Sequence, residues 1–201
     1  MSRYTGPRNK LARAIGQDLG LKTNAMKTAK RLNTPPGQHG AKNRRRGSDY
    51  GTQLKEKQKI RFIYGLTEKQ LRRVYADAAR AKTNTGETLL SLIELRLDNV
   101  VYRLGFAPTR ASARQLVNHG HVRVSDKKVT IPSYRTRPEE IITLSKRGIN
   151  IPVIEAMVKE DSVAPAWLEK KAAVGKVSRK PERQDIAEAI QEQLVVEYYS
   201  R

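Results

Sequence analysis

The spacing of hydrophobic residues divides the chain into a stretch without periodicity, a helical stretch and a stretch where helices give way to strands. Residues 1–50 contain few large apolar residues and many glycine, proline, asparagine and basic residues. Such a segment gains too little from apolar burial to order itself. We therefore expect a basic arm over 1–50 that is extended or loosely folded until a partner fixes it, with a turn at 35–40.

Residues 53–81 have the period of a helix. One apolar stripe is suggested by Leu54, Ile60, Ile63 and Tyr64. Thr67 is a natural N-cap for a second helix, because its hydroxyl can accept a hydrogen bond from an unpaired backbone N–H. The pattern predicts a helical domain over 51–90, which we expect the C-terminal segment 176–201 to complete.

The strongest helical pattern in the chain lies over residues 88–104. Its apolar residues recur every three or four positions and predict one buried stripe, formed by Leu89, Leu92, Ile93, Leu97, Val100, Val101 and Leu104. Gly105 is expected to end this helix. Arg96, Asn99 and Arg103 are spaced i, i+3, i+7 and would share a second, polar face.

After this helix the pattern changes from helical to alternating. Thr109 is a plausible N-cap for a short helix over 110–118, and Gly120 stands where a left-handed residue is needed to stop it. Strands are expected at 121–124, 129–131 and 141–144, with a turn at 125–128. We therefore predict an α+β protein: a mostly α-helical N-terminal domain with a basic extended arm, and an inserted module over 91–175 with two helices and a small, mostly antiparallel sheet.

Charge identifies the kind of partner. The chain carries 40 Lys and Arg against 20 Asp and Glu, a net charge of +20, and residues 1–61 hold 16 of the basic and 3 of the acidic side chains. Such an excess favours a polyanion, with nucleic acid the first candidate. No stretch approaches the roughly 18 apolar residues of a spanning helix. The absence of cysteine and the presence of only three histidines predict no disulfide, no metal and no cofactor.

The basic, polar and aromatic residues best placed to meet RNA lie in the arm, on the first predicted helix and on the two helices of the module. Those expected to contact it are Arg3, Arg8, Arg44, Arg45, Arg46, Tyr50, Gln53, Lys57, Arg61, Arg96, Asn99, Arg103, Arg110, Arg114, Gln115 and His119. Most of them would touch phosphates or sugars and recognise shape, because A-form helices hide their base edges. Roles without RNA contact stay open for some of these residues. Residues 42–46 could form a solvated charge cluster or a nuclear-import signal. Lys57 and Arg61 could lie on a solvated helix face, and Tyr50 could pack against the protein.

Several segments resemble one known family. Arg96–Gly105, Thr109–Val117 and His119–Val122 resemble the alpha-L RNA-binding module. The surrounding segments resemble the bacterial-type fourth protein of the small ribosomal subunit, and they are 36–40, 48–51, 53–59, 84–87, 167–169 and 193–200. The resemblance covers essentially the whole chain.

This resemblance implies a function. Members bind small-subunit ribosomal RNA early, at a multi-helix junction of the 5′ domain, and so nucleate assembly of the subunit body. They contact the fifth small-subunit protein at an interface linked to decoding accuracy, lie near the path by which messenger RNA enters, and in some bacteria repress their own messenger. Many carry an N-terminal cysteine cluster that binds zinc, so this chain resembles the zinc-free branch. The implied location is the ribosome in the cytoplasm, or in the stroma for a plastid-encoded member.

Three other functions compete with this interpretation. Arg96-Leu97-Asp98 resembles the short motif that supplies a catalytic aspartate in pseudouridine synthases, but no region of about 200 residues remains for a catalytic domain. An ion pair of Asp98 with a nearby arginine is the preferred role, and we expect no enzyme activity. A ribosome-associated quality-control factor would be one short domain with a basic tail. A DNA-compacting protein fits the charge alone, which does not distinguish DNA from RNA.

Overall fold

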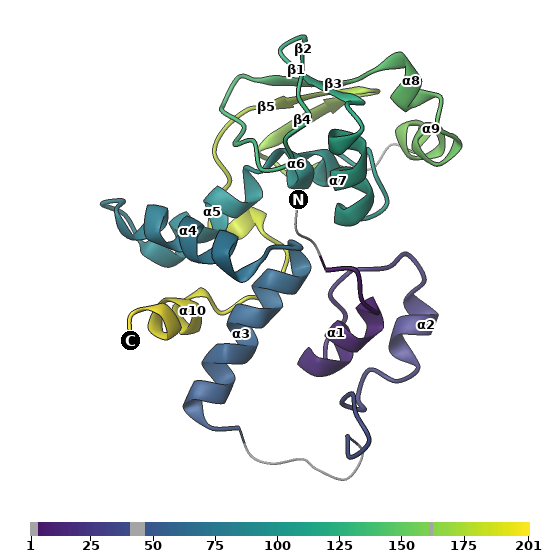
Figure 1. Cartoon of the computed structure of the whole chain (residues 1–201). Helices are drawn as coiled ribbons and strands as arrows, with labels where there is room; N and C mark the ends of the chain where they lie inside the picture. The colour runs from purple at the N-terminus through teal and green to yellow at the C-terminus, as the bar shows by residue number, and fades with distance from the viewer. Residues whose placement is uncertain (1–3, 41–46, 161–162) are drawn as a thin grey trace. The chain divides into compact units, whose positions relative to one another are not determined.

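The computed structural model describes residues 4–40, 47–160 and 163–201, and the chain forms two compact units. The first unit comprises Met1–Leu89 and Glu188–Arg201, and the second comprises Leu90–Ala187. Figure 1 shows helices in the first unit and helices with a sheet in the second. The α+β class predicted from the sequence is confirmed. Residues 176–187 lie in the second unit, whereas the sequence pattern assigned them to the helical domain.

The first unit is helical. Its elements are α1 (Arg8–Ile15), α2 (Ala25–Ala29), α3 (Asp49–Ile63), α4 (Glu68–Ala79), the first half of α5 (Thr85–Glu94) and α10 (Glu192–Tyr199). The C-terminal helix α10 packs along α3, as Figure 1 shows. Thr67 caps α4 as predicted, since its hydroxyl accepts from the Gln70 N–H while the Gln70 side chain accepts from the Thr67 N–H.

The arm is more ordered than its composition predicts. It contains the two short helices α1 and α2, and α1 lies against α3. Side chains tie the arm together: Arg8 donates to the Leu21 carbonyl, and Arg13 donates to the carbonyls of Thr34 and Pro35. In these segments the structure differs from the extended or loosely folded arm that the composition predicts, because side-chain hydrogen bonds to backbone supply what apolar burial does not. That the arm is fixed only against its partner stays a prediction.

The second unit is a layer of helices on one face of a sheet. Its elements are α6 (Leu97–Arg103), α7 (Arg110–Asn118), β1 (Val122–Val124), β2 (Lys127–Lys128), β3 (Ile141–Leu144), α8 (Lys146–Ile149), α9 (Pro152–Lys159), β4 (Leu168–Lys171), β5 (Val174–Val177) and the short 3-10 helix η1 (Arg183–Asp185). The five strands are antiparallel in the order β2-β1-β3-β5-β4. A Cβ atom at Gly175 would clash with the Leu104 side chain, so the end of α6 packs directly on β5.

The helix predicted over residues 88–104 is two helices. The chain leaves helical geometry at Leu95 and Arg96, between α5 and α6. The Leu95 carbonyl accepts from the N–H and hydroxyl of Thr136, and the Leu97 N–H donates to the Tyr134 carbonyl. A distant segment thus takes over backbone groups that a continuous helix would use. The single face predicted for Arg96, Asn99 and Arg103 is wrong for this reason.

The other local predictions for the module are mostly confirmed. Helix α7 has the predicted bounds, with Thr109 as its N-cap, and Gly105 and Gly120 both have positive φ. Strand β3 has the predicted bounds, but the first hairpin differs. Its loop is only Ser125 and Asp126, both at positive φ, so the second strand is Lys127–Lys128 rather than 129–131. No helix in the described part of the chain is long and apolar enough to cross a membrane.

Candidate nucleic-acid interface

Helices α6 and α7 carry the arginines that the sequence pattern singles out in the module. Arg103 is the last residue of α6, while Arg110 and Arg114 lie one turn apart on α7. Arg96 precedes α6 as its N-cap. The two helices pack against each other in the core of the second unit. The fold therefore gathers these four arginines around one pair of helices.

Glu94 organises one half of this cluster. Its carboxylate accepts from Arg103 through Nε at 3.0 Å and Nη2 at 2.7 Å, and from Asn99 Nδ2 at 2.6 Å. The Asn99 Oδ1 in turn accepts from Arg110 Nε at 2.8 Å. The Arg110 guanidinium lies over the Tyr102 ring, 4.5 Å from its centre. Charge-assisted bonds of this kind fix the orientation of planar guanidinium groups.

Asp98 organises the other half. Arg96 donates to it through two nitrogens at 3.1 and 2.8 Å, and Arg114 Nη1 lies 3.9 Å from the same carboxylate. The prediction of an ion pair between Asp98 and a nearby arginine is confirmed. The Arg96 side chain is only 5% exposed, so in this structure it supports the module from inside.

The far end of α7 leads to an exposed polar surface. Gln115 and His119 are both exposed there, and the ring of His119 lies 6.2 Å from that of His121. Further exposed basic residues in the second unit were missing from the sequence-based set, and among them are Arg123, Lys127, Lys128, Lys146 and Arg147. Alternation in Val122-Arg123-Val124 is the signal that could have found the first of them.

In the first unit the predicted residues divide into exposed and buried ones. Tyr50 is 48% exposed, whereas Gln53 and Lys57 are 6% and 5% exposed and face α10. Gln53 Nε2 donates to Glu197, and Lys57 Nζ lies 3.2 Å from Glu68 Oε2 and 3.3 Å from the Tyr198 hydroxyl. The bonds to Glu197 and Tyr198 attach the C-terminal helix to α3, and the Lys57–Glu68 pair joins α3 to α4.

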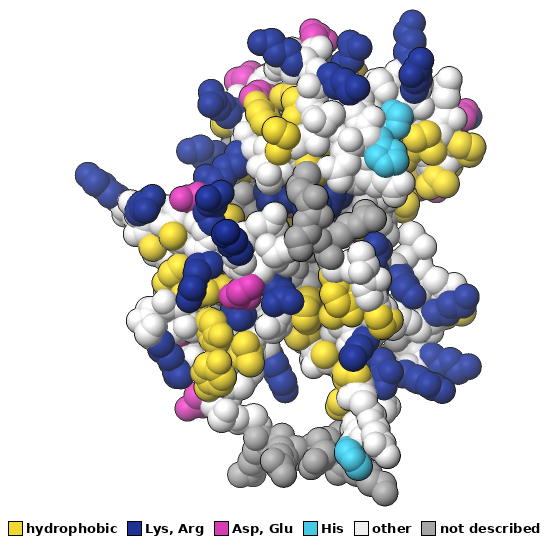
Figure 2. Space-filling view, in the orientation of Figure 1, with side chains coloured by type: hydrophobic (Ala, Val, Ile, Leu, Met, Phe, Trp, Pro, Cys, Tyr) yellow, Lys and Arg dark blue, Asp and Glu magenta, His cyan; other side chains and the backbone are white. Residues whose placement is uncertain are grey.

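Two of the arginines predicted in the first unit, Arg8 and Arg61, lie among the described residues. Arg61 is 30% exposed and lies 3.6 Å from Glu68, and Arg8 holds the arm as described above. The sequence-based set also includes Arg3 and the run Arg44, Arg45 and Arg46, which lie outside the described residues. On the face that it draws, Figure 2 shows Lys and Arg side chains on both units and few Asp or Glu side chains among the described residues.

Glu68 makes the first unit sensitive to acid. Burial raises the pKa of its carboxyl, but the Tyr199 hydroxyl and the charges of Lys57 and Arg61 outweigh burial, so the pKa lies below its ordinary value. A carboxyl whose folded-state pKa is depressed stabilises the fold above its unfolded pKa of about 4.3, and loses that contribution as pH falls through the folded value.

We therefore expect Glu68→Gln to lower the stability of the first unit near pH 7, and the difference from the original chain to shrink as pH falls below about 4. Urea unfolding followed by circular dichroism between about pH 7 and 3 measures this. Glu87→Gln, at an exposed position of α5, is the matched control. Stability curves that stay parallel down to pH 3 would contradict the assignment.

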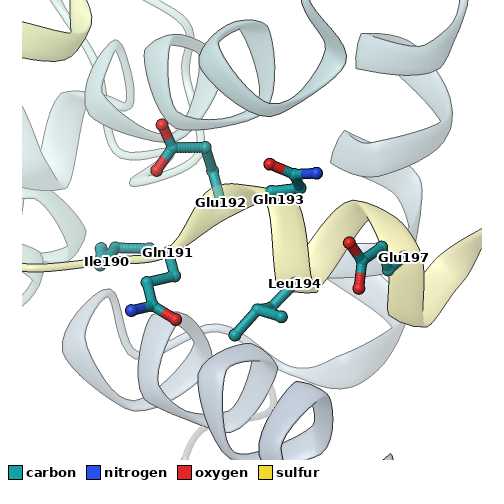
Figure 3. Close-up of a pocket in the computed structure, with 6 residues that line it drawn as sticks. All are labelled: Ile190, Gln191, Glu192, Gln193, Leu194 and Glu197. Carbon is teal, nitrogen blue, oxygen red and sulfur yellow. The ribbon is translucent and has the colours of Figure 1, made fainter. Parts of the chain in front are cut away.

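Other kinds of site find little support in the described residues. No group of three or more His, Cys, Asp or Glu side chains among them is placed to hold a metal ion. A shallow surface hollow lies beside α10 and the two residues before it. It is lined by Ile190, Gln191, Glu192, Gln193, Leu194 and Glu197. Figure 3 shows Glu192 and Gln193 on one side of the backbone and Gln191 and Leu194 on the other. The polar groups do not converge on one point, as a small-molecule site requires.

Comparison with known proteins decides the family. Residues 3–94 match the model of the ribosomal protein S4/S9 N-terminal domain, and residues 95–142 match the model of the S4 domain. A protein of Methylobacillus flagellatus named small ribosomal subunit protein uS4 is 51% identical over 205 residues, which cover 100% of this chain and 98% of that protein. The chain belongs to the uS4 family of small ribosomal subunit proteins. The resemblance seen in the sequence is thereby confirmed.

Other relatives agree with this family. Proteins of the same name from Brevibacillus brevis and Akkermansia muciniphila are each 48% identical, over 203 and 206 residues, with full coverage of both chains. The match to the S4 domain begins at Leu95, at the break between α5 and α6. The arginines of α6 and α7 and the carboxylate of Asp98 therefore lie in the S4 domain, and Glu94 is the residue directly before it.

Proposed function

We propose that the chain is a structural constituent of the small ribosomal subunit that binds small-subunit ribosomal RNA directly. The observation that carries this proposal is the full-length similarity to proteins named small ribosomal subunit protein uS4. The geometry of the S4 domain supports it, since guanidinium groups held by carboxylates beside exposed basic residues suit phosphate and shape recognition. The proposal includes no catalytic step.

The interface that we propose uses both units. In the second unit it comprises Arg103, Arg110, Arg114, Gln115 and His119, joined by the exposed basic residues of the β1–β2 hairpin and α8. In the first unit it comprises Arg8, Tyr50 and Arg61, together with Arg3 and 44–46. Arg96, Asn99, Gln53 and Lys57 are 6% exposed or less, so we assign them to supporting these contacts rather than to touching RNA.

The finer roles in this proposal rest on the family resemblance. They are recognition of a helix junction in the 5′ domain, nucleation of subunit assembly, a contribution to accuracy at a contact with the fifth small-subunit protein, proximity to messenger RNA, and repression of the chain's own messenger. The corresponding location is the ribosome. A basic first unit suits early RNA binding for two reasons. Each phosphate contact releases counterions and so adds affinity. The positive charge also attracts RNA from a distance and so speeds association.

Equilibrium binding across a salt series tests the proposal. The full chain is titrated with a small-subunit ribosomal RNA fragment that contains the 5′-domain junction, against transfer RNA and duplex DNA as competitors. We expect a preference for the fragment that survives moderate salt, because specific contacts add to the counterion-release contribution. Equal affinity for all polyanions, falling together as salt rises, would reduce the chain to a generic basic protein.

A further inference from the structure

Glu94 is an unusual residue for its surroundings. It is the last residue of α5 and pairs with Arg103, and its side chain is only 1% exposed. Burying a carboxylate is costly unless hydrogen bonds and opposite charge compensate for the lost water. Here three bonds from Arg103 and Asn99 supply that compensation. A neutral residue at this position would avoid the free-energy cost of burying a charge, so the presence of a carboxylate needs a functional explanation.

Asn99 extends the influence of this carboxylate to a second arginine. The Asn99 Nδ2 donates to both the carboxylate and the backbone carbonyl of Glu94, which fixes the amide with its Oδ1 turned toward Arg110. Asn99 is 2% exposed, so its own amide cannot reach a partner on the surface. Arg110 is thus held on two sides, by the Asn99 oxygen and by the Tyr102 ring.

We propose that Glu94 is a positioning residue of the RNA interface, which orients Arg103 directly and Arg110 through Asn99. This inference rests on the proposed function. A free arginine loses rotamer freedom when it binds a phosphate, whereas one already held by a carboxylate has lost much of it before binding. The buried charge therefore improves the fit to one RNA shape rather than the attraction to polyanions in general.

The sign of the effect distinguishes positioning from simple electrostatics. Glu94→Gln removes one negative charge and raises the net charge above +20. Attraction alone predicts that the variant binds every polyanion at least as well as the original chain. Positioning predicts the reverse for the ribosomal RNA fragment, because the glutamine amide cannot hold two nitrogens of Arg103 and the Asn99 amide as a carboxylate does.

The experiment compares Glu94→Gln with Glu155→Gln in the full chain. Glu155 is exposed on α9 and paired with Lys159, so this control makes the same charge change away from the cluster. We expect Glu94→Gln to lower the preference for the 5′-domain fragment over an unrelated RNA duplex by about tenfold. Its affinity for the duplex, and the dependence of that affinity on salt, should equal those of the control. A preference equal to the control's would overturn the proposal.

A second variant keeps the test decisive if Glu94→Gln alters the thermal unfolding of the chain. Asn99→Ala leaves the net charge and both bonds of the Glu94–Arg103 pair in place. It removes the link to Arg110, together with the Asn99 bonds to the carboxylate and carbonyl of Glu94. We expect a loss of preference of about threefold, again without change in duplex affinity. An unchanged preference of Asn99→Ala for the 5′-domain fragment would show that Asn99 does not orient Arg110 for RNA binding. If the original chain itself shows no preference, the proposed function has failed, and this result is distinct from either variant outcome.

Discussion

Replacing Trp167 by alanine should lower the free energy of unfolding of the second unit by about 3–5 kcal/mol, the cost typical of deleting a large buried aromatic side chain. Trp167 is 0% exposed and precedes β4. It belongs to the core that joins α6 and α7 to the sheet, together with Phe106, Leu104, Ile142 and Val177. Urea unfolding of the full chain, followed by circular dichroism at several wavelengths, measures the change.

Trp167→Phe is the matched control for this prediction. Among the described residues the buried indole Nε1 has no hydrogen-bond partner, so losing its N–H removes no bond between described groups. We expect a cost below about 1.5 kcal/mol, as for other swaps that keep most of the apolar volume. A loss of less than 1 kcal/mol in the alanine variant would show that the side chain does not hold the helices to the sheet.

The parts of the fold that depend on local chemistry could be predicted from the sequence. Thr67 and Thr109 cap helices because a hydroxyl before a helical run can satisfy its first N–H groups. Gly105 and Gly120 end helices because glycine tolerates positive φ. In each case the deciding atoms lie within a few residues of one another, so the pattern alone is sufficient.

The break between α5 and α6 could not be predicted in this way. Apolar residues keep their helical spacing through Leu95, and no glycine or proline interrupts them. The cause is Thr136, 41 residues away, which donates to the Leu95 carbonyl. A hydrogen-bond partner so distant in sequence leaves no local signal, and a periodic stripe is compatible with one helix or two.

The candidate interface was likewise predictable where it depends on local sequence and unpredictable where it depends on distant contacts. The sequence identified the arginines, because their number and spacing are visible without a structure. It could not separate the buried Arg96 from the partly exposed Arg110, because that difference depends on which carboxylates the fold brings near. Glu94 was absent from the sequence-based set, since one acidic residue in an amphipathic helix is ordinary.

The largest expected effect on RNA binding comes from Arg103 and Arg114. We expect the paired change Arg103→Lys and Arg114→Lys to lower affinity for the 5′-domain fragment by about 10- to 100-fold, although the net charge stays at +20. Lysine carries a compact charge and cannot form the two-nitrogen contact that Arg103 makes with Glu94. Filter binding or fluorescence anisotropy at fixed salt measures the loss.

The matched control is the paired change Lys170→Arg and Lys171→Arg on β4. It exchanges the same two residue types in the opposite direction and also conserves the net charge. If α6 and α7 carry the interface, this control keeps nearly full affinity, and the Arg103 and Arg114 variant still binds transfer RNA and duplex DNA as the original chain does. Equal losses in the two variants would mean that guanidinium geometry on α6 and α7 has no special part in recognition. An unchanged affinity in both would leave net charge as the dominant cause of binding, since charge is the one property that neither variant alters.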